Sequence, residues 1–570
     1  MNLVSSVCYY YINQRIIMLR QTRKFSSFSN GFFISTPIYY ANAAPHLGHL
    51  YSSLIADTIN RFENLTSFHR NILFSTGTDE HGMKVLQSAQ KHNVSIENYC
   101  KSISSQYKNL FKESGIEYSN FIRTTDDQHK IAVTDLWNKL KAQNAIYKDK
   151  YSGYYCLQDE TFLSESQLNT DPITGKKTSI ESGHPVEWSE EENYMFKLTD
   201  YQEDVIYWAK HENRVVPNKF NKILLDMLHN ERLPDLSISR PSSRMTWGVP
   251  VPNDSSQNIY VWLDALTNYL TVAGYPNEMK IWPPNVQVIG KDILKFHGIY
   301  WPAFLIAANL EPPEQLLVHS HWTVDGQKMS KSKGNVIDPM ERSKLYSFEG
   351  IRYFLLREGV QHSDGNYSDE KIIKILNAEL ANTLGNLFSR ACAKSLNPEQ
   401  IIPKIDPEQM NELIKNESCK ILFEKMTELP DIARKFYTEY SFHLVVDSVM
   451  STLHAANGFF ESAKPWEFKN SNEHSDMAKL DTIISITLEC LRICGIVMQP
   501  IVPNYSSKLL DRLNVSKELR FWKDTKLNLA KINRPLVSLD SNVLFQKIII
   551  ADKAEKEKKE KIRVNKKRVH

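Results

Sequence analysis

His46 and His49 are three positions apart, so a helix would place both imidazole rings on one face near its amino-terminal end. Unpaired backbone N–H groups and the helix dipole favour a bound phosphate at such an end. Gly48 adds no side chain where a nucleotide must come close. The pattern predicts two ring donors that stabilise the charge on a transferring phosphate. Taken alone, the same pattern also fits surface or metal-binding histidines.

A second candidate for phosphate chemistry is the segment Lys328-Met329-Ser330-Lys331-Ser332, which follows a β-prone run and the turn Asp325-Gly326. A loop with two ammonium groups can close on the β- and γ-phosphates of ATP and neutralise them while pyrophosphate leaves. By itself, such a Lys/Ser stretch is typical of an ordinary solvated loop. The two motifs together, in this order and on either side of an insertion, resemble the class I aminoacyl-tRNA synthetases. The resemblance implies an ATP site built from His46, Gly48, His49, Lys328, Met329, Ser330, Lys331 and Ser332.

The elements around the first motif predict a strand, a loop and then a helix. Residues 32–36 are β-prone, and the helix is expected to start at Pro45, because apolar or small residues recur at three- and four-residue spacing after it. Residues 71–76 read as a second strand, so a βαβ unit with a parallel sheet is the economical topology. The carboxyl ends of such strands build the ligand site. We therefore expect a doubly wound, Rossmann-type α/β fold.

Changes in composition and hydrophobic periodicity along the chain divide it into parts. A Tyr-rich, acidic stretch interrupts the α/β pattern, which resumes in the runs NIYVWLDAL, NVQVIG and QLLVHSHW, and a helical pattern follows beyond Ile372. At 570 residues, several packed units are expected. The expected parts are a transit peptide (1–28), the first half of the nucleotide-binding domain (29–125), an inserted domain (126–240), its second half (241–330), a mobile loop with a linker (331–380), a helical anticodon-binding bundle (381–545) and a charged tail (546–570).

Composition narrows the classes of function. There is no apolar run of about eighteen residues, so we expect no membrane span. The net charge of +3 is small beside 69 basic and 66 acidic side chains, so any nucleic-acid binding must come from local patches. The seven cysteines are scattered and form no C-x-x-C pair, which indicates a reducing compartment. Cys490 and Cys494 are interpreted as buried core thiols.

The amino-terminal segment is basic, rich in hydroxyl groups and free of Asp and Glu before Asp57. This composition is typical of a mitochondrial transit peptide and predicts import into the mitochondrial matrix. A disordered tail with a chance charge bias is the alternative.

Within class I, the flanking blocks resemble the methionyl-tRNA synthetases. The matching blocks occur in family order at residues 35–52, 77–84, 121–129, 260–269, 288–305 and 325–339, and the bundle adds 381–390 and 463–469. The resemblance implies that methionine is activated with Mg·ATP and then transferred to tRNA(Met). It also implies a methionine pocket of Tyr40, Asp79, Trp262, Ala265, Tyr269, His297 and Trp301. An aromatic-walled pocket suits a thioether, and the Asp79 carboxylate suits an α-ammonium group.

The bundle carries candidate anticodon contacts. Asn382, Asn386 and Arg390 recur at four-residue spacing, and Trp466 follows Lys464-Pro465. Readers of single-stranded RNA splay bases onto aromatic faces and fix their edges with hydrogen bonds. The residues alone favour a polar helix face and a buried tryptophan, whereas the family resemblance reverses that preference and implies contacts with a CAU anticodon.

Two departures from the family pattern bear on cofactor and assembly. Leu266 stands where many relatives have proline, and the insertion has only Cys156 where many relatives carry Cys₄ zinc knuckles. One thiol cannot build such a site, so no structural zinc is expected. The chain also lacks the carboxyl-terminal module of some bacterial members, so a monomer is expected.

Three other functions compete with this interpretation. A class I synthetase for isoleucine, valine, leucine or cysteine would need an editing domain or a zinc-binding cysteine set. An RNA-binding protein that has lost catalysis would not need intact phosphate-site residues. A small nucleotidyltransferase would share the H-x-G-H motif but would have no helical bundle.

Overall fold

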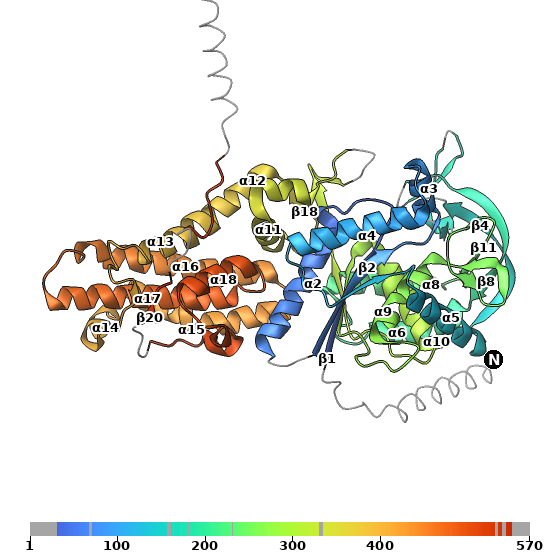
Figure 1. Cartoon of the computed structure of the whole chain (residues 1–570). Coiled ribbons are helices and arrows are strands. Elements are labelled where there is room, and N and C mark those ends of the chain that lie inside the picture. Colours follow the sequence, from blue (N-terminus) through green and yellow to red (C-terminus); the bar gives the residue numbers. More distant parts are fainter. Residues whose placement is uncertain are drawn as a thin grey trace, which may run out of the picture.

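The structure is a computed structural model and describes most of the chain in two lobes, an α/β part and a helical part (Figure 1). The expected transit peptide, nearly all of the charged tail, and Ser330, Lys331 and Ser332 lie outside the described residues. The structure describes residues 31–67, 71–156, 161–163, 165–172, 174–180, 183–230, 232–329, 334–529, 534–537 and 543–549.

A six-stranded sheet forms the centre of the α/β part, and every neighbouring pair of its strands is parallel. In spatial order its strands are β3 (Asn120–Arg123), β2 (Asn71–Asp79), β1 (Gly31–Tyr40), β14 (Val286–Gly290), β15 (Leu316–His319) and β9 (Val215–Val216). Successive residues point to opposite faces: Val288 packs in one core and Ile289 in another. Two buried faces confirm the predicted Rossmann-type α/β fold.

Helices cover both faces of this sheet. The core on one side contains α2 (Leu47–Thr66), α4 (Ile96–Glu113) and α11 (Pro339–Glu358). The core on the other side contains α5 (Asp127–Ala142), α6 (Leu198–Ala209), α7 (Asn218–Asn230), α8 (Val261–Leu266), α9 (Asn268–Ala273) and α10 (Trp301–Ala307). α3 (Met83–Lys91) follows β2.

The helix that carries the first motif has the predicted periodicity, and its apolar positions Leu47, Tyr51, Leu54 and Phe62 are all buried. It begins at Leu47, two residues after the predicted start. The reason is that His46 is extended and caps the helix: its ring accepts the backbone N–H of Gly48.

Between β3 and β14 the chain forms smaller sheets. The largest is antiparallel, with the order β10 (Leu236–Ser237), β8 (Glu187–Phe196), β4 (Ile146–Cys156) and β5 (Thr161–Leu163). A hairpin joins β6 (Leu168–Thr170) to β7 (Lys177–Ser179), and a third sheet contains β11 (Ser239–Pro241), β12 (Pro250–Val251) and β13 (Asp254–Ile259). Strand β9 falls within the range expected for the insertion, yet it pairs with β15 at the edge of the central sheet.

One predicted strand is partly wrong. The run NIYVWLDAL was expected to resume the sheet, but β13 ends at Ile259 and α8 starts at Val261. A short apolar run does not distinguish a buried strand from a buried helix.

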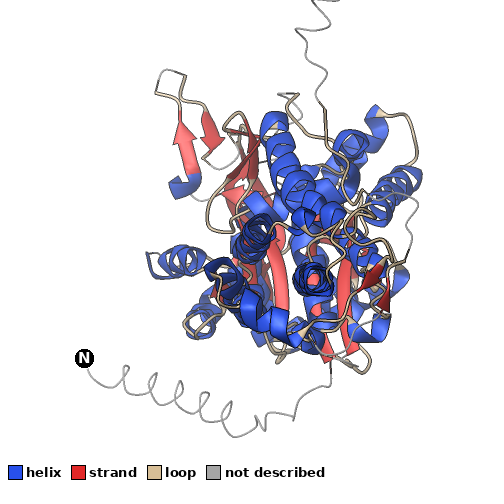
Figure 2. Cartoon of the chain, turned by 90° about the vertical axis from the view of Figure 1, so that its left-hand side faces the viewer, coloured by secondary structure: helices blue, strands red, loops and turns tan. Residues whose placement is uncertain are grey.

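The helical part begins beyond a small sheet of β16 (Trp322–Val324), β17 (Gln327–Lys328) and β18 (Gly365–Tyr367). Its helices are α12 (Asp369–Ile375), α13 (Asn386–Ala391), α14 (Pro407–Leu413), α15 (Glu417–Thr438), α16 (Phe442–Ala463), α17 (His474–Val497) and α18 (Pro503–Arg512). A π-helical segment, Leu376–Gly385, joins α12 to α13 within the run predicted as one helix. α16 packs between α15 and α17 in this part (Figure 1), and Figure 2 views the chain from the same end.

Six cysteines lie among the described residues, and all are buried. Burial raises the pKa of the Cys100 thiol to about 12 and those of Cys392 and Cys419 to about 11. Cys490 and Cys494 lie in α17 and are buried, as predicted for core thiols. Within the described ranges, no helix combines the length and apolar character that crossing a bilayer requires.

Candidate active site

A cavity of about 380 Å³ opens at the carboxyl ends of the central strands. β1 contributes Tyr40, β2 contributes Asp79, and β14 and β15 end at Gly290 and His319 on its wall. The start of α2 and the helices α8 and α9 also contribute to the lining. Parallel α/β sheets bind their ligands at this edge, so the cavity is where the topology predicts a site.

The two imidazoles of the first motif both line this cavity. Their rings are stacked with centroids 3.7 Å apart and planes 23° apart. Each ring is held by the backbone: Gly48 N–H donates to His46 Nδ1 at 3.0 Å, and His46 N–H donates to His49 Nδ1 at 3.2 Å. The pair therefore stands in a fixed geometry at the positive end of α2.

Gly48 also lines the cavity, and its lack of a side chain has a local cause. A Cβ at this position would lie only 2.9 Å from His46 Cε1, closer than such atoms approach. Glycine is therefore needed for the His46 ring to cap α2, in addition to leaving room for a ligand.

The described part of the Lys/Ser loop reaches the same cavity. Lys328 and Met329 line it, and Asn335 Nδ2 donates to the Lys328 carbonyl at 3.2 Å. Burial opposes ionisation of the Asp292 carboxyl, but its pKa is nevertheless lowered, mainly by His321, whose Nε2 donates to it at 3.0 Å, and less by the charge of Lys328. Ser330, Lys331 and Ser332 lie outside the described residues.

Six of the seven residues expected around methionine line the cavity: Tyr40, Asp79, Trp262, Ala265, Tyr269 and His297. Trp262 stacks on Phe296 with ring centroids 3.6 Å apart. Asp79 is 8% exposed, so a carboxylate is held at the cavity wall with little access to water.

Trp301 was expected among them and does not line the cavity. It is fully buried behind Tyr269, with ring centroids 5.9 Å apart. The preceding residues Phe296–Tyr300 form a π-helical turn. A π turn holds more residues than an α turn, so the four-residue spacing from His297 does not keep Trp301 on the pocket face.

His297 is neutral and fixed in orientation. Its Nδ1 faces the carbonyl of Ile293 at 3.0 Å, and a carbonyl can only accept, so Nδ1 carries the proton. Nε2 then accepts from the Tyr269 hydroxyl at 2.9 Å. Burial lowers the pKa of His297 to about 4. The ring therefore presents an uncharged wall, which suits a thioether.

The sequence analysis missed several residues near the cavity. His319, at the end of β15, lines it, and its Nε2 lies 2.8 Å from Ser52 Oγ of α2. Asp264, between Trp262 and Ala265, is buried and accepts from His81 Nδ1 at 2.7 Å and His129 Nε2 at 2.9 Å. These contacts tie α8 to the turn after β2 and to α5. The available signals were a histidine at a strand end and an acid within an apolar helix, which must find a partner.

Comparison with known families decides the identity. The family described as "tRNA synthetases class I (M)" matches residues 32–392, and the "Anticodon binding domain of methionyl tRNA ligase" matches residues 420–565. The chain belongs to the class I methionyl-tRNA synthetases. All of the residues that line the cavity lie within the first match.

Individual relatives of this synthetase agree. The mitochondrial methionine–tRNA ligase of Takifugu rubripes is 43% identical over 545 residues, which cover 93% of this chain and 91% of the relative. That of Homo sapiens is 44% identical over 506 residues, covering 86% and 84%. The structure of Mycobacterium tuberculosis methionyl-tRNA synthetase in complex with methionyl-adenylate superposes with a TM-score of 0.84 at 34% identity, covering 90% of this chain and 99% of that one. The predicted activity of an ATP-dependent methionine–tRNA ligase is confirmed.

A second group of expected site residues of the synthetase lies on its bundle. The Arg390 guanidinium stands 5.6 Å from the Trp466 ring centroid and pairs with Glu461 at 2.6 Å. Trp466 is 37% exposed, so it is not the buried tryptophan of the alternative interpretation. Asn382, in the π-helical segment, and Asn386, which starts α13, are both exposed. The structure brings Arg390 and Trp466 together and leaves both amides open to solvent.

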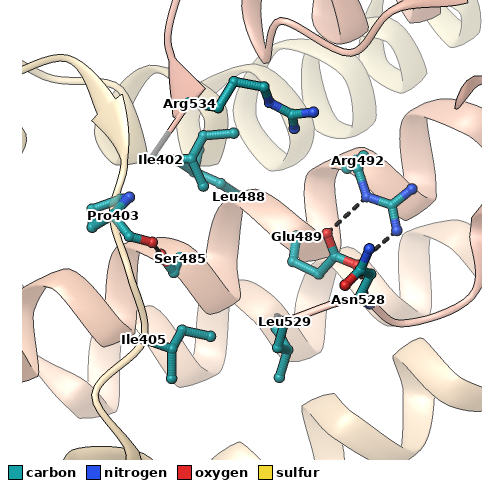
Figure 3. Close-up of a pocket in the computed structure, with 10 residues that line it drawn as sticks. All are labelled: Ile402, Pro403, Ile405, Ser485, Leu488, Glu489, Arg492, Asn528, Leu529 and Arg534. Atoms are coloured by element: carbon teal, nitrogen blue, oxygen red, sulfur yellow. Dashed lines mark hydrogen bonds and ion pairs between the residues drawn. The ribbon is translucent and has the colours of Figure 1, made fainter. Parts of the chain in front are cut away.

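A smaller cavity in the bundle is not a substrate site (Figure 3). It measures about 10 Å³, which is room for about one water molecule. Glu489 and Arg492 pair across it at 2.7 Å, and the backbone N–H of Asn528 donates to Glu489 at 2.8 Å. These contacts hold the segment after α18 against α17.

Proposed function

We propose that the cavity between α2, α8 and β15 is where this synthetase joins methionine to ATP. A methionine carboxylate oxygen attacks the α-phosphorus of Mg·ATP, a new P–O bond forms, and the bond to the bridging oxygen of pyrophosphate breaks. A terminal-ribose hydroxyl of tRNA(Met) then attacks the carbonyl carbon of the adenylate, so that an ester bond forms, the bond to the phosphate oxygen breaks and AMP leaves. The supporting observation is that two stacked imidazoles and six expected methionine contacts line a single cavity.

The phosphate side of the proposed site is the amino-terminal end of α2. His46 and His49 donate from Nε2 to the phosphates, because each Nδ1 already accepts a backbone N–H. Lys328 brings a positive charge from the opposite wall, and Lys331, with Met329, Ser330 and Ser332, completes the ATP contacts. Fixed donors of this kind stabilise charge that grows as pyrophosphate leaves.

The methionine side lies between β1, β2, α8 and α9. Asp79 binds the α-ammonium group, because a carboxylate with little access to water is a strong partner for it. Tyr40, Trp262, Ala265, Tyr269 and His297 surround the thioether, and sulfur packs well against ring edges. Trp301 supports Tyr269 from behind.

In this proposal, the helical bundle binds the anticodon of the tRNA. Trp466 offers a half-exposed ring on which an anticodon base can stack, and Arg390 is held against that ring. Asn382 and Asn386 supply amide groups for base edges on the same helical run.

We also propose where the protein works, that it is a monomer, and where the parts of its chain begin and end. The acid-free amino-terminal segment and the names of the relatives support a mitochondrial protein that works in the matrix. The protein acts as a monomer, and its chain is divided at the boundaries predicted from the sequence. It holds no structural zinc, because the insertion offers Cys156 as its only thiol.

The test is ATP–pyrophosphate exchange measured with each amino acid in turn, followed by charging of tRNA(Met). We expect exchange with methionine, and exchange at least about a hundredfold weaker with isoleucine, valine, leucine and cysteine. A preference for another amino acid would refute the assigned pocket. Metal analysis of the same sample should give less than one zinc per chain.

A further inference from the structure

We propose that Tyr107 is a positioning residue that holds His49 in the tautomer whose Nε2 carries the proton, so that this ring donates to the phosphates of ATP. The inference rests on the proposed role of His49. Tyr107 lies in α4, is fully buried and does not line the cavity, so it acts only through its neighbour.

The hydrogen-bond pattern at His49 determines its tautomer. The backbone N–H of His46 points at His49 Nδ1 over 3.2 Å, and a backbone N–H can only donate. Nδ1 must therefore be the bare nitrogen of the neutral ring. The Tyr107 hydroxyl approaches the same Nδ1 at 3.0 Å, so in this contact the hydroxyl donates. The proton of the ring then belongs to Nε2.

The surroundings of Tyr107 keep its hydroxyl protonated and therefore able to donate a hydrogen bond. Its burial raises the pKa of its hydroxyl well above the ordinary value, so the hydroxyl keeps its hydrogen at every working pH. Its ring stacks on Tyr39 with centroids 5.2 Å apart and planes 3° apart, which fixes the direction of the hydroxyl. The Tyr39 hydroxyl instead contacts the His49 carbonyl at 3.2 Å and Ser53 Oγ at 2.7 Å.

The two imidazoles of the motif thus differ in how they are held. The Nδ1 of His46 accepts from the Gly48 backbone, and the cap of α2 fixes it. The Nδ1 of His49 receives a second donor from another helix. In the opposite tautomer, His49 would turn a lone pair toward the phosphates and an N–H toward the backbone N–H of His46, which can only donate. The Tyr107 hydroxyl gives the unprotonated Nδ1 a second hydrogen bond and so further favours the tautomer that donates from Nε2.

The first test replaces Tyr107 with Phe, which keeps the ring and its stack on Tyr39 and removes only the hydroxyl. We expect kcat for methionine-dependent exchange to fall about three- to tenfold, as loss of one buried hydrogen bond predicts. The KM values for methionine and ATP should stay within about twofold, because the effect belongs to the transition state.

The matched control is Tyr99→Phe. Tyr99 lies on the same helix, and its hydroxyl donates to the Asn42 carbonyl at 3.0 Å. Its loss should leave kcat within about twofold of the wild type. An equal fall in both variants would assign the effect to general loosening of α4 and overturn the proposal.

A double-mutant cycle separates positioning from packing. If Tyr107 acts through His49, then Tyr107→Phe should cost nothing further in a His49→Ala background. An undiminished additional loss there, or wild-type kcat in Tyr107→Phe alone, would overturn the inference. If His49→Ala itself exchanged at the wild-type rate, the proposed function would fail instead.

A spectroscopic measurement completes the test. In protein labelled with ¹⁵N-histidine, the His49 resonances are those lost in His49→Ala. Long-range ¹H–¹⁵N correlations should show its Nδ1 unprotonated in the wild type and a mixture of tautomers in Tyr107→Phe. A protonated Nδ1 in the wild type would refute the proposal.

Discussion

The cavity and the face of the bundle that carries Trp466 hold their functional side chains in opposite ways. In the cavity, His297 and the two motif histidines are fixed by backbone and buried side-chain partners. On the bundle, Trp466 is 37% exposed, and Arg390 is held by a surface carboxylate. Stabilising a transition state requires donors that do not move, whereas reading RNA requires rings and edges that a base can reach.

This difference implies that the two regions can be damaged separately. Under the proposed function, we expect adenylate formation to need only the cavity and tRNA charging to need both regions. Four predictions follow from it, from the largest expected effect to the smallest.

The largest effect is expected at the cavity. His49→Ala removes a fixed donor to charge that grows in the transition state, so kcat for exchange should fall about 10²- to 10³-fold with little change in methionine KM. His454→Ala is the matched control, because His454 is an exposed histidine on α16. Steady-state exchange kinetics measure both variants. Equal rates in the two would mean that the imidazole pair has no catalytic role.

On the bundle, Trp466→Ala should reduce kcat/KM for charging full-length tRNA(Met) about 10- to 100-fold, because base stacking on an aromatic ring is lost. Arg390→Ala should act in the same direction, and Arg434→Ala, at an exposed arginine of α15, should not. Exchange without tRNA should stay normal in all three.

An acceptor-stem minihelix sharpens this result. It has no anticodon, so Trp466→Ala should charge it as the wild type does. If exchange fell in step with charging, Trp466 would be a packing residue and the contrast between the two regions would disappear.

A smaller effect is expected on the KM for methionine, and its size should differ between a residue that lines the cavity and a residue packed behind it. His297→Ala should raise the KM for methionine about tenfold and leave the KM for ATP within about twofold, because His297 lines the cavity on the proposed methionine side. Trp301→Phe, behind Tyr269, should raise the methionine KM less than about threefold. If Trp301→Phe raised the methionine KM more than His297→Ala did, Trp301 would have to contact methionine directly.

The smallest effect concerns pH. Burial lowers the pKa of both His297 and His319 to about 4, whereas a histidine in the unfolded chain titrates near 6.5. Between these values the unfolded state binds more protons, so the two rings contribute stability that is complete above 6.5 and lost as the pH falls toward 4. The free energy of unfolding should drop by about 1 kcal/mol from pH 7 to pH 6.

Urea unfolding of the ligand-free protein at the two pH values measures this drop. A double variant, His297→Gln with His319→Gln, should be less stable than the wild type and lack this part of the pH dependence. An unchanged slope in the double variant would show that other groups cause it.

Much of the fold could be predicted because local patterns and tertiary structure agree. The periodicity of α2 matches its buried face, and strand runs such as NVQVIG are central and apolar. Predictions were less accurate where the local period changes: a π turn precedes Trp301, and another contains Asn382. No sequence pattern distinguishes such turns from α-helix.

The site could be predicted only as far as neighbouring residues and family motifs define it. Asp264 finds His81 and His129 from two other elements, and Tyr107 meets His49 from a helix that begins 47 residues after it. Contacts of this kind depend on how helices pack across the sheet. The chain alone shows that a buried acid needs a partner but does not show which one it finds.

Burial protects the six cysteines of the described ranges from thiol reagents in the folded protein. With a pKa near 11, as for Cys392 and Cys419, only about one thiol in a thousand is ionised at pH 8, and the thiolate is the form that alkylating agents and peroxides attack. All six described cysteines share this burial, and they are spread over both lobes. Alkylation therefore has to wait until the surrounding helices open. The labelling rate of each cysteine can be measured by mass spectrometry. It reports how often the part of the chain around that cysteine unfolds.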